Sequence, residues 1–371
     1  MTREIPNPKS QRIGRRFGAV IGVQEVGLVL VVVLLGMVLT AFGGRVRMIE
    51  FRKSSSGEME RVVVEKNKFF NARNLTQLAK DTSFIAIMAV GATFVIIAGG
   101  IDLSVGATYA LASVLAALVF RRFGPEGTSQ SGSGVLTGVL TCIAVGAAAG
   151  LLNGGMIVLL KVHPFIITLG TMAIYRGIAF VVTQGQSVGG FPENFRTAVR
   201  WEIGDGLSLV PLMVMLLVTA VGGIYLSRLA AGRRVYAIGG NELASRYSGI
   251  QVDRVRLSVF LFSGLTAGIA ALLALGYYGS ASSGDGQGYE LNVIAAAVVG
   301  GASLSGGKGS ALGALLGALI IQMINTGIVI LGIDQNYSQI IIGAVVIIAV
   351  LFDQLNNWLA KRRLAGRALA S

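Results

Sequence analysis

Residues 82–120 read TSFIAIMAVGATFVIIAGGIDLSVGATYALASVLAALVF. Two apolar runs, at about 82–100 and 106–120, lie on either side of a short polar break around Asp102. A membrane-spanning helix needs roughly 20 apolar residues, so these runs predict helices that cross a lipid bilayer. The break places glycines and an acidic residue between two such helices, which makes it the first candidate site.

The rest of the chain repeats this pattern. Of its 371 residues, 53% are hydrophobic and 13% are charged. Further apolar runs lie at about 26–42, 135–160, 165–183, 208–227, 257–279, 291–304, 311–332 and 337–352. We therefore predict an all-α polytopic integral membrane protein with about ten transmembrane helices over residues 26–355. The composition argues against soluble enzymes, nucleic-acid-binding domains and disulfide-stapled secreted modules, so no nucleic-acid partner is expected.

The basic residues predict which segments face the cytoplasm. The formal net charge is +13, and Lys and Arg cluster in the N-terminal segment 1–25, the loop 228–256 and the tail 356–371. Cytoplasmic loops carry an excess of Lys and Arg, and ten spans put both termini on one side. We expect a multi-pass protein of the cytoplasmic membrane with both termini in the cytoplasm.

The segment 43–80 disagrees with this rule, because it holds nine Lys and Arg and yet falls outside on this count. Residues 47–51 and 61–65 are short β-prone stretches, and the turn-like residues 54–57 separate them. We predict a small external β-hairpin in a charged insertion.

Two segments of the chain share a glycine-rich pattern. Gly99-Gly-Ile-Asp-Leu-Ser-Val-Gly106 and Gly300-Gly-Ala-Ser-Leu-Ser-Gly-Gly307 start 201 positions apart. Glycine-interrupted helices at corresponding places in two halves indicate a transport pathway, although compositional chance is an alternative. The pattern leaves open whether the halves are parallel or inverted. The expected structural glycines are Gly99, Gly100, Gly106, Gly300, Gly301 and Gly307.

Asp102 is the polar residue in this pattern that most strongly indicates a specific role, because an acidic group at membrane depth is costly and is usually paired or functional. It either caps the helix that starts near Ser104, contacts a solute, or relays protons. Other polar positions in the spans offer neutral amides, which suit a hydroxyl-rich solute or tie helices together. Arg176 is expected to bind backbone carbonyl groups or a carboxylate. The candidate pathway residues are Asp102, Ser104, Asn153, Asn292, Ser303, Gln322 and Asn325.

Other motifs predict no chemistry. Residues 305–310 resemble a phosphate loop but lack its first glycine and its Ser or Thr after the lysine. His163 is a lone histidine at a span boundary, and Cys142 is a small packing residue in an apolar run. Glycines spaced four apart, at 146–154 and 309–317, predict close helix packing within one subunit or at a dimer interface. We expect neither a metal site nor a catalytic residue.

The loop 228–256 contains a short candidate helix. Asn241 is a good N-cap, Glu242 occupies the first turn, and Gly249 closes the C-terminus. A helix of about two turns is marginal alone, so it lies against its own bundle, the lipid surface or a soluble partner.

With these residues the sequence resembles the permease subunits of bacterial ABC importers for monosaccharides, the ribose-type family. The resemblance runs from about Phe69 to Leu355. Its most specific elements are both glycine motifs, Pro164-Phe-Ile-Ile-Thr-Leu-Gly-Thr-Met172, Tyr175-Arg-Gly177, Gly240-Asn-Glu242 and Ser248-Gly-Ile250. The basic N-terminal extension and the insertion at about 45–66 depart from the family pattern.

The resemblance implies a type II ABC importer permease that dimerises, with itself or with a paralogue, around a central pathway. It implies a periplasmic sugar-binding protein and a cytoplasmic ABC ATPase as partners, with ATP and magnesium on the ATPase and no cofactor in this chain. The short helix becomes the coupling helix. Its residues Asn241, Glu242, Ala244, Arg246 and Gly249 would contact the ATPase, with Glu242 in a groove of that subunit.

The function expected from the sequence is a non-enzymatic permease for a pentose or hexose, embedded in membrane lipid. An amino acid, a nucleoside or a signalling furanose is an alternative cargo within the same class. An ion-coupled secondary transporter is a rival of another class, although such proteins usually show more buried carboxylates. A membrane-embedded enzyme would need a catalytic constellation, and none can be assembled from these residues.

Overall fold

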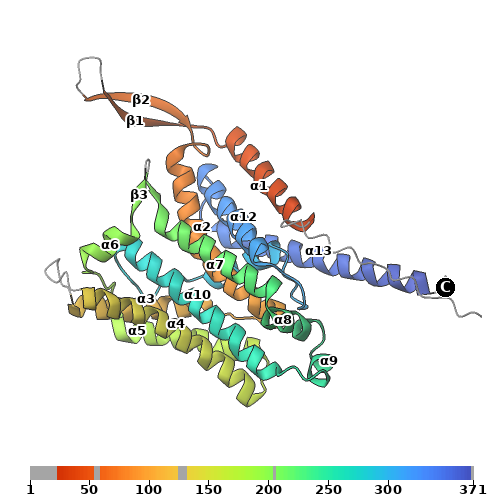
Figure 1. The fold of residues 1–371 in the computed structure, drawn as a ribbon. Coiled ribbons are helices and arrows are strands. Elements are labelled where there is room, and N and C mark those ends of the chain that lie inside the picture. The colour runs from red at the N-terminus through yellow and green to blue at the C-terminus, as the bar shows by residue number, and fades with distance from the viewer. Residues whose placement is uncertain (1–22, 54–58, 124–131, 204–205, 369–371) are drawn as a thin grey trace, which may run out of the picture.

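The computed structural model describes residues 23–368 except 54–58, 124–131 and 204–205. Long helices form one bundle, and a β-hairpin projects from one end of it (Figure 1). The long helices are α1 (Val23–Phe42), α2 (Ala72–Ile97), α3 (Val105–Phe123), α4 (Gly132–Leu160), α5 (Pro164–Thr183), α7 (Leu209–Arg228), α10 (Val252–Tyr278), α12 (Ala311–Ile330) and α13 (Tyr337–Ala368). The short elements are α6 (Glu193–Val199), β3 (Glu202–Ile203), β4 (Leu207–Ser208), α8 (Ala230–Gly240), α9 (Glu242–Tyr247) and α11 (Tyr289–Val299).

Nine helices in the described part of the chain are long and apolar enough to cross a membrane, which confirms an all-α polytopic membrane protein. The run at 291–304 differs from expectation, because it contains only α11. The 11 residues of α11 span about 17 Å, less than the roughly 30 Å of a bilayer core. The helix ends at a glycine pair, since Gly301 adopts φ +94°, which favours glycine.

The segment with α11 nevertheless runs along the bundle as a tenth pass. At the end of α10, the Tyr278 hydroxyl group donates to Asp81 Oδ1 at 3.3 Å. After α11, the N–H of Gly307 donates to the carbonyl group of Ile97 at 2.8 Å. Asp81 and Ile97 lie 16 residues apart in α2, about 24 Å along that helix. The short helix α11 and the irregular segment after it therefore replace the tenth full helix.

The first and the last helix both contact this irregular segment. Gln24 Nε2 in α1 donates to the carbonyl group of Gly300 at 3.5 Å, and Ser303 Oγ donates to Asp353 Oδ2 in α13 at 2.6 Å. We call this the α9 end of the bundle, and the opposite end the hairpin end. An even number of passes thus brings the start of α1 and the middle of α13 to the same end.

The predicted hairpin is confirmed. Strands β1 (Arg45–Lys53) and β2 (Met59–Asn67) pair antiparallel, from Arg45 opposite Asn67 to Lys53 opposite Met59. The foot of the hairpin is fixed by Asn67, whose Nδ2 donates to the carbonyl group of Thr40 at 2.7 Å and whose Oδ1 accepts the N–H of Phe69 at 2.9 Å. The predicted turn at 54–57 lies outside the described residues.

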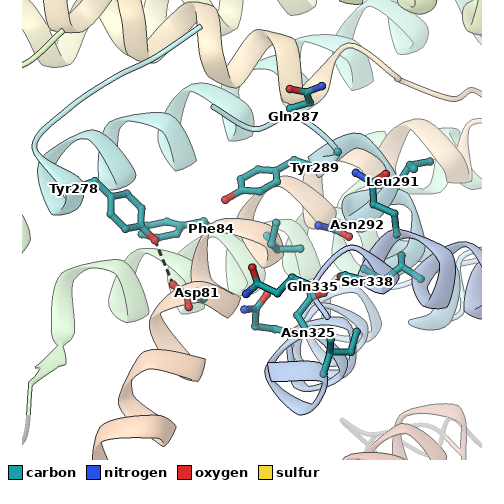
Figure 2. Close-up of a pocket in the computed structure, with 16 residues that line it drawn as sticks. Asp81, Phe84, Tyr278, Gln287, Tyr289, Leu291, Asn292, Asn325, Gln335 and Ser338 are labelled. Atoms are coloured by element: carbon teal, nitrogen blue, oxygen red, sulfur yellow. Dashed lines mark hydrogen bonds between the residues drawn. The ribbon is translucent and has the colours of Figure 1, made fainter. Parts of the chain in front are cut away.

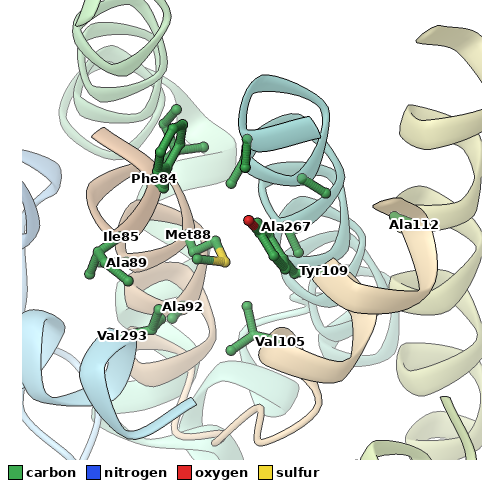
Figure 3. Packing of buried hydrophobic residues seen from close by; sticks show 14 of the residues in the cluster. Phe84, Ile85, Met88, Ala89, Ala92, Val105, Tyr109, Ala112, Ala267 and Val293 are labelled. Carbon is green, nitrogen blue, oxygen red and sulfur yellow. The ribbon is translucent and has the colours of Figure 1, made fainter. Parts of the chain in front are cut away.

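Helix α2 forms the centre of the bundle, since 94% of its most apolar window is buried. Small residues on α2 let its neighbours approach closely, and Figure 3 shows Ala92 beside Val293 of α11, while Met88 points toward Tyr109 of α3 and Ala267 of α10. Helices α1 and α13 are mostly exposed. Their exposed apolar side chains are the surface expected of helices that face lipid.

The glycine spacing in α4 is explained by packing within one chain. A Cβ atom at Gly146 would lie 2.4 Å from the carbonyl oxygen of Gly264 in α10, and one at Gly150 would lie 2.3 Å from that of Phe260. Real Cβ atoms are not found at such distances, so the two backbones are in direct contact. In the same way, Gly313 and Gly317 of α12 pack on the backbone of Gly300 and Ala296.

Candidate functional site

The α9 end carries the short helix predicted in the loop 228–256. Asn241 caps it, because its side chain accepts the N–H of Ala244 at 2.9 Å. Gly249 follows the helix with φ +83°, the left-handed conformation that ends many helices. Both capping predictions are confirmed, and α9 presents its first turn at the edge of the bundle.

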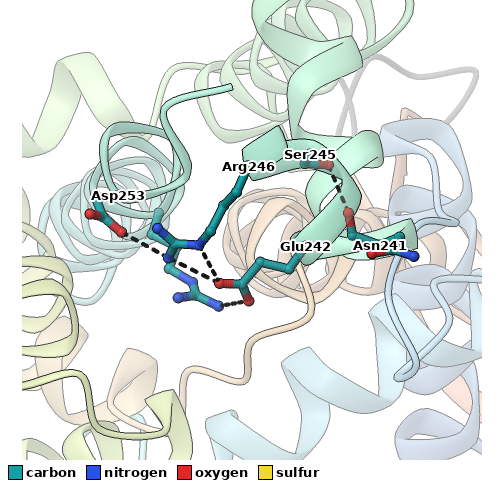
Figure 4. Close-up of polar contacts among 6 residues, drawn as sticks. Asn241, Glu242, Ser245, Arg246 and Asp253 are labelled. Atoms are coloured by element: carbon teal, nitrogen blue, oxygen red, sulfur yellow. Dashed lines mark hydrogen bonds and ion pairs between the residues drawn. The ribbon is translucent and has the colours of Figure 1, made fainter. Parts of the chain in front are cut away.

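Charged side chains join α9 to α10 (Figure 4). Arg246 Nη2 pairs with Glu242 Oε1 at 3.0 Å and with Asp253 Oδ1 at 3.2 Å. Arg256 in α10 pairs with the second carboxylate oxygen of Glu242. The hydrogen bond that Arg246 donates to Glu242 raises the pKa of Arg246. The resemblance places Glu242 in a partner's groove, whereas in this structure two arginines of its own chain hold it.

A cavity of about 630 Å³ lies between α9 and the connection of α4 to α5. Its polar lining includes Lys161, His163 and the ion pairs just described. His163 is structural, as predicted, because its Nδ1 accepts the N–H of Phe165 at 3.3 Å and caps α5.

A chain of polar side chains crosses the middle of the bundle. Asp102 Oδ1 accepts from the N–H and the hydroxyl group of Ser104 at 2.9 and 2.7 Å, and its Oδ2 accepts from Ser263 of α10 at 2.7 Å. Asn153 of α4 donates to Ser104 Oγ at 2.7 Å, and Tyr175 of α5 donates to Asn153 Oδ1 at 3.2 Å. All five side chains are buried, so the network ties α3, α4, α5 and α10 together.

Both glycine motifs interrupt helices, and the structure brings them together. The first motif joins α2 to α3, the second joins α11 to α12, and the hydrogen bond from Gly307 to Ile97 connects the two breaks. Gly99, Gly301 and Gly307 have φ of +80°, +94° and +73°. Position 106 requires glycine for a steric reason, because a Cβ atom there would lie 2.4 Å from the carbonyl oxygen of Gly286. Gly100 lies against Val95, and Gly300 against Gly313.

A polar cavity of about 530 Å³ lies among α2, α11, α12 and α13 toward the hairpin end (Figure 2). Three of the predicted pathway residues line it, namely Asn292, Gln322 and Asn325. Ser338 Oγ donates to Asn325 Oδ1 at 2.6 Å. The volume falls within the range of about 300–1,000 Å³ that is usual for small-ligand sites. We call this the larger cavity, because it is the larger of two adjoining cavities; the separate cavity beside α9 exceeds both in volume.

Asp81 is the carboxylate of the larger cavity, and the sequence reasoning missed it. Its carboxylate accepts from Gln77 Nε2 at 2.9 Å and from the Tyr278 hydroxyl group at 3.3 Å, and it pairs with Lys80 Nζ at 3.4 Å. Lys80 is buried with its Nζ 4.0 Å from the centroid of the Tyr277 ring. An adjacent Lys and Asp directly before the apolar run at 82–100 was the available signal, because charges there border the membrane.

The seven predicted pathway residues thus fall into separate groups. Asp102, Ser104 and Asn153 belong to the buried network, Asn292, Gln322 and Asn325 line the larger cavity, and Ser303 bonds to Asp353 at the α9 end. Of the alternatives for Asp102, the geometry favours a capping and helix-tying role, because it accepts an N–H at the start of α3. The prediction for Arg176 is confirmed, since its Nη1 donates to the carbonyl groups of Ser283 and Asp285 at 2.8 and 2.6 Å.

Comparisons with known proteins agree on one kind of protein. The family described as branched-chain amino acid transport system / permease component matches residues 74–350. The ribose import permease RbsC of Escherichia coli K12 is 40% identical over 287 residues, which cover 77% of this chain and 87% of that protein. RbsC of Bacillus subtilis 168 is 40% identical over 77% of this chain and 86% of its own length. The D-allose permease AlsC of E. coli K12 is 37% identical over 77% and 85%. No solved structure matches the chain.

Proposed function

The chain belongs to the branched-chain amino acid transport system / permease component family, and from this premise we propose that it is the membrane-spanning subunit of an ATP-driven importer for a monosaccharide. The larger cavity is the observation that carries the proposal. Its predicted amides and Ser338 are uncharged, and such groups donate and accept hydrogen bonds without a fixed charge. The relatives, which import ribose and transport D-allose, favour a sugar over the amino acid in the family's description.

We place the partners at opposite ends of the bundle. The ABC ATPase, with its ATP and magnesium, would bind the cytoplasmic α9 end, and a periplasmic sugar-binding protein would bind the hairpin end. A second permease subunit, identical or paralogous, would complete the pathway in the inner membrane. The chain itself would hold no cofactor and carry out no reaction.

Purification from native membranes in mild detergent tests the proposal. We expect an ATPase subunit to copurify in stoichiometric amount, and uptake in vesicles to continue when ionophores collapse the ion gradients while ATP is retained. Uptake that stops with the gradients, together with absence of any ATPase under conditions that keep known ABC complexes intact, would indicate an ion-coupled secondary transporter.

The amides of the larger cavity give a second expected result. The triple variant Asn292→Ala, Gln322→Ala and Asn325→Ala should reduce the uptake rate at low substrate concentration about tenfold or more, because each lost hydrogen bond costs about 0.5–1.5 kcal/mol and 1.4 kcal/mol is a factor of ten. Initial rates of labelled sugar uptake in well-expressed protein measure it. Gln186→Ala, an exposed amide, is the control. Uptake unchanged in the triple variant would exclude these residues from the pathway.

A further inference from the structure

A second polar cavity of about 310 Å³ lies beside the larger one, between α3, the end of α10 and the segment 280–289. We call it the inner chamber. The two cavities have a common wall, because Tyr278 and Tyr289 line both of them. Nothing in the proposed function assigns a role to this space.

The walls of the inner chamber suit a hydroxyl-rich ring. Tyr109 and Ser113 form a buried polar surface, and Ser280 and Asp285 add hydrogen-bonding groups. The rings of Tyr109 and Tyr289 have centroids 5.5 Å apart and are tilted by 55°. Tyrosine combines a flat apolar face with a hydroxyl group, which matches the apolar ring face and polar edge of a monosaccharide.

Gly286 allows the chain to pass next to the Tyr109 ring. It has φ +66°, and a Cβ atom there would lie 2.9 Å from Tyr109 Cδ1. The chamber thus depends on close approach of the segment 280–289 to α3.

Tyr278 in the common wall contacts the Tyr277 ring, with ring centroids 5.3 Å apart, and Lys80 Nζ, which lies 5.3 Å from the Tyr278 ring centroid. The Tyr278 hydroxyl group donates to Asp81 on the side of the larger cavity, and its ring centroid is 6.0 Å from that of Phe84. A solute hydroxyl group that bonds to Asp81 would compete for the same carboxylate, and the Tyr278 side chain would then lose its hydrogen bond to Asp81 and keep its ring contacts.

We propose that the inner chamber is a second holding site for the neutral, hydroxylated solute, and that the solute enters it from the larger cavity when Tyr278 turns away. The identity of the solute rests on the proposed function. The route rests on the geometry of the described residues alone.

Cysteine accessibility tests the route without a known cargo. The chain has a single cysteine, Cys142, which is buried, so Cys142→Ser gives a thiol-free background. On this background Ser113→Cys reports on the inner chamber and Asn325→Cys on the larger cavity. A small hydrophilic methanethiosulfonate is applied to the full chain in detergent, and the labelling rate is read by mass spectrometry. Size-exclusion chromatography checks that each variant is folded.

We expect Tyr278→Ala to raise the labelling rate of Ser113→Cys at least tenfold and to change that of Asn325→Cys less than twofold. An equal rate for Ser113→Cys with and without Tyr278 would overturn the route, whether that rate is fast or slow. A parallel rise at Asn325→Cys would overturn it as well, because Tyr278 would then act on the larger cavity as a whole.

Protection by a sugar separates this inference from the proposed function. With ribose as the first probe and D-allose as the second, a cargo should slow labelling of Asn325→Cys and, with Tyr278→Ala, also that of Ser113→Cys. Protection at Asn325→Cys alone would overturn the second holding site and leave the proposed function intact. No protection at either position by either sugar would count against both.

Discussion

The variant Glu242→Arg should lose at least tenfold in uptake while it remains folded and inserted in the membrane. Glu242 accepts from Arg246 and pairs with Arg256 of α10, so an arginine there places three cations together at the first turn of α9. The stability cost is small, because exposed ion pairs contribute about 0–1 kcal/mol. The expected loss arises because α9 would no longer hold its angle to α10 or fit the proposed ATPase partner. ATP hydrolysis and uptake, measured in the same vesicles, should become uncoupled.

A charge exchange shows which of these two roles dominates. The double variant Glu242→Arg with Arg256→Glu restores the ion pair between α9 and α10 in reversed polarity. Recovery of uptake would mean that Glu242 acts through its ion pair within this chain. Continued loss would mean that the proposed ATPase contacts the negative charge of Glu242. Asp253→Ala, on an exposed part of the same cluster, is the matched control. Normal uptake by Glu242→Arg itself would contradict the coupling role of α9.

The second large effect is expected on stability, from Asp102→Ala. The substitution leaves the N–H and hydroxyl group of Ser104 and the hydroxyl group of Ser263 without their acceptor in a buried site. An unsatisfied buried donor costs about 1–3 kcal/mol, so we expect a loss of about 3 kcal/mol or more in the free energy of unfolding. Thermal unfolding of the detergent-solubilised protein measures it.

The conservative variant separates the structural role of Asp102 from contact with the solute. Asp102→Asn keeps one acceptor oxygen and should lose less than half as much stability. Its KM for uptake should stay within about twofold, because Asp102 lines neither the larger cavity nor the inner chamber. A KM raised tenfold or more in a stable Asp102→Asn protein would instead show that Asp102 meets the cargo.

Helix α10 takes part in three of the polar contacts described above. Arg256 pairs with α9, Ser263 bonds to Asp102, and Tyr278 bonds to Asp81. From Arg256 to Tyr278 is 22 residues along one helix, about 33 Å. A change in the angle of α9 could therefore be transmitted to the larger cavity through α10, which is one continuous helix. The double variant above tests the first contact in this series.

Local patterns in the sequence predicted much of this fold. Apolar runs predicted the spans, and Asn241 and Gly249 predicted the ends of α9. Two β-prone stretches with turn-like residues between them predicted the hairpin. Each of these patterns depends on neighbours in the chain. The length of α11 was missed, since an apolar run continues through Gly300 and Gly301 while their backbone conformation ends the helix.

Local sequence patterns could not predict which site residues contact one another in the folded chain. Asp102 and Ser263 are 161 residues apart, and Tyr278 and Asp81 are 197 apart. Contacts of this kind are created by helix packing, which no single-sequence pattern specifies. Polar residue type selected Asn292, Gln322 and Asn325, which line the larger cavity. The same criterion grouped Asn153 with them, although Asn153 belongs to the buried network.

The direct backbone contact between α4 and α10 also bears on how the protein is made. α4 ends at Leu160 and α10 begins at Val252, so 91 residues must be synthesised before the partner of the α4 glycines starts to emerge. At roughly 5–20 residues per second, the ribosome needs about 5–20 seconds for this interval. Gly146 and Gly150 must wait in lipid for that time without the partner backbone that their lack of side chains requires. The nascent chain therefore acquires the contact between α4 and α10 late, only when α10 has been synthesised.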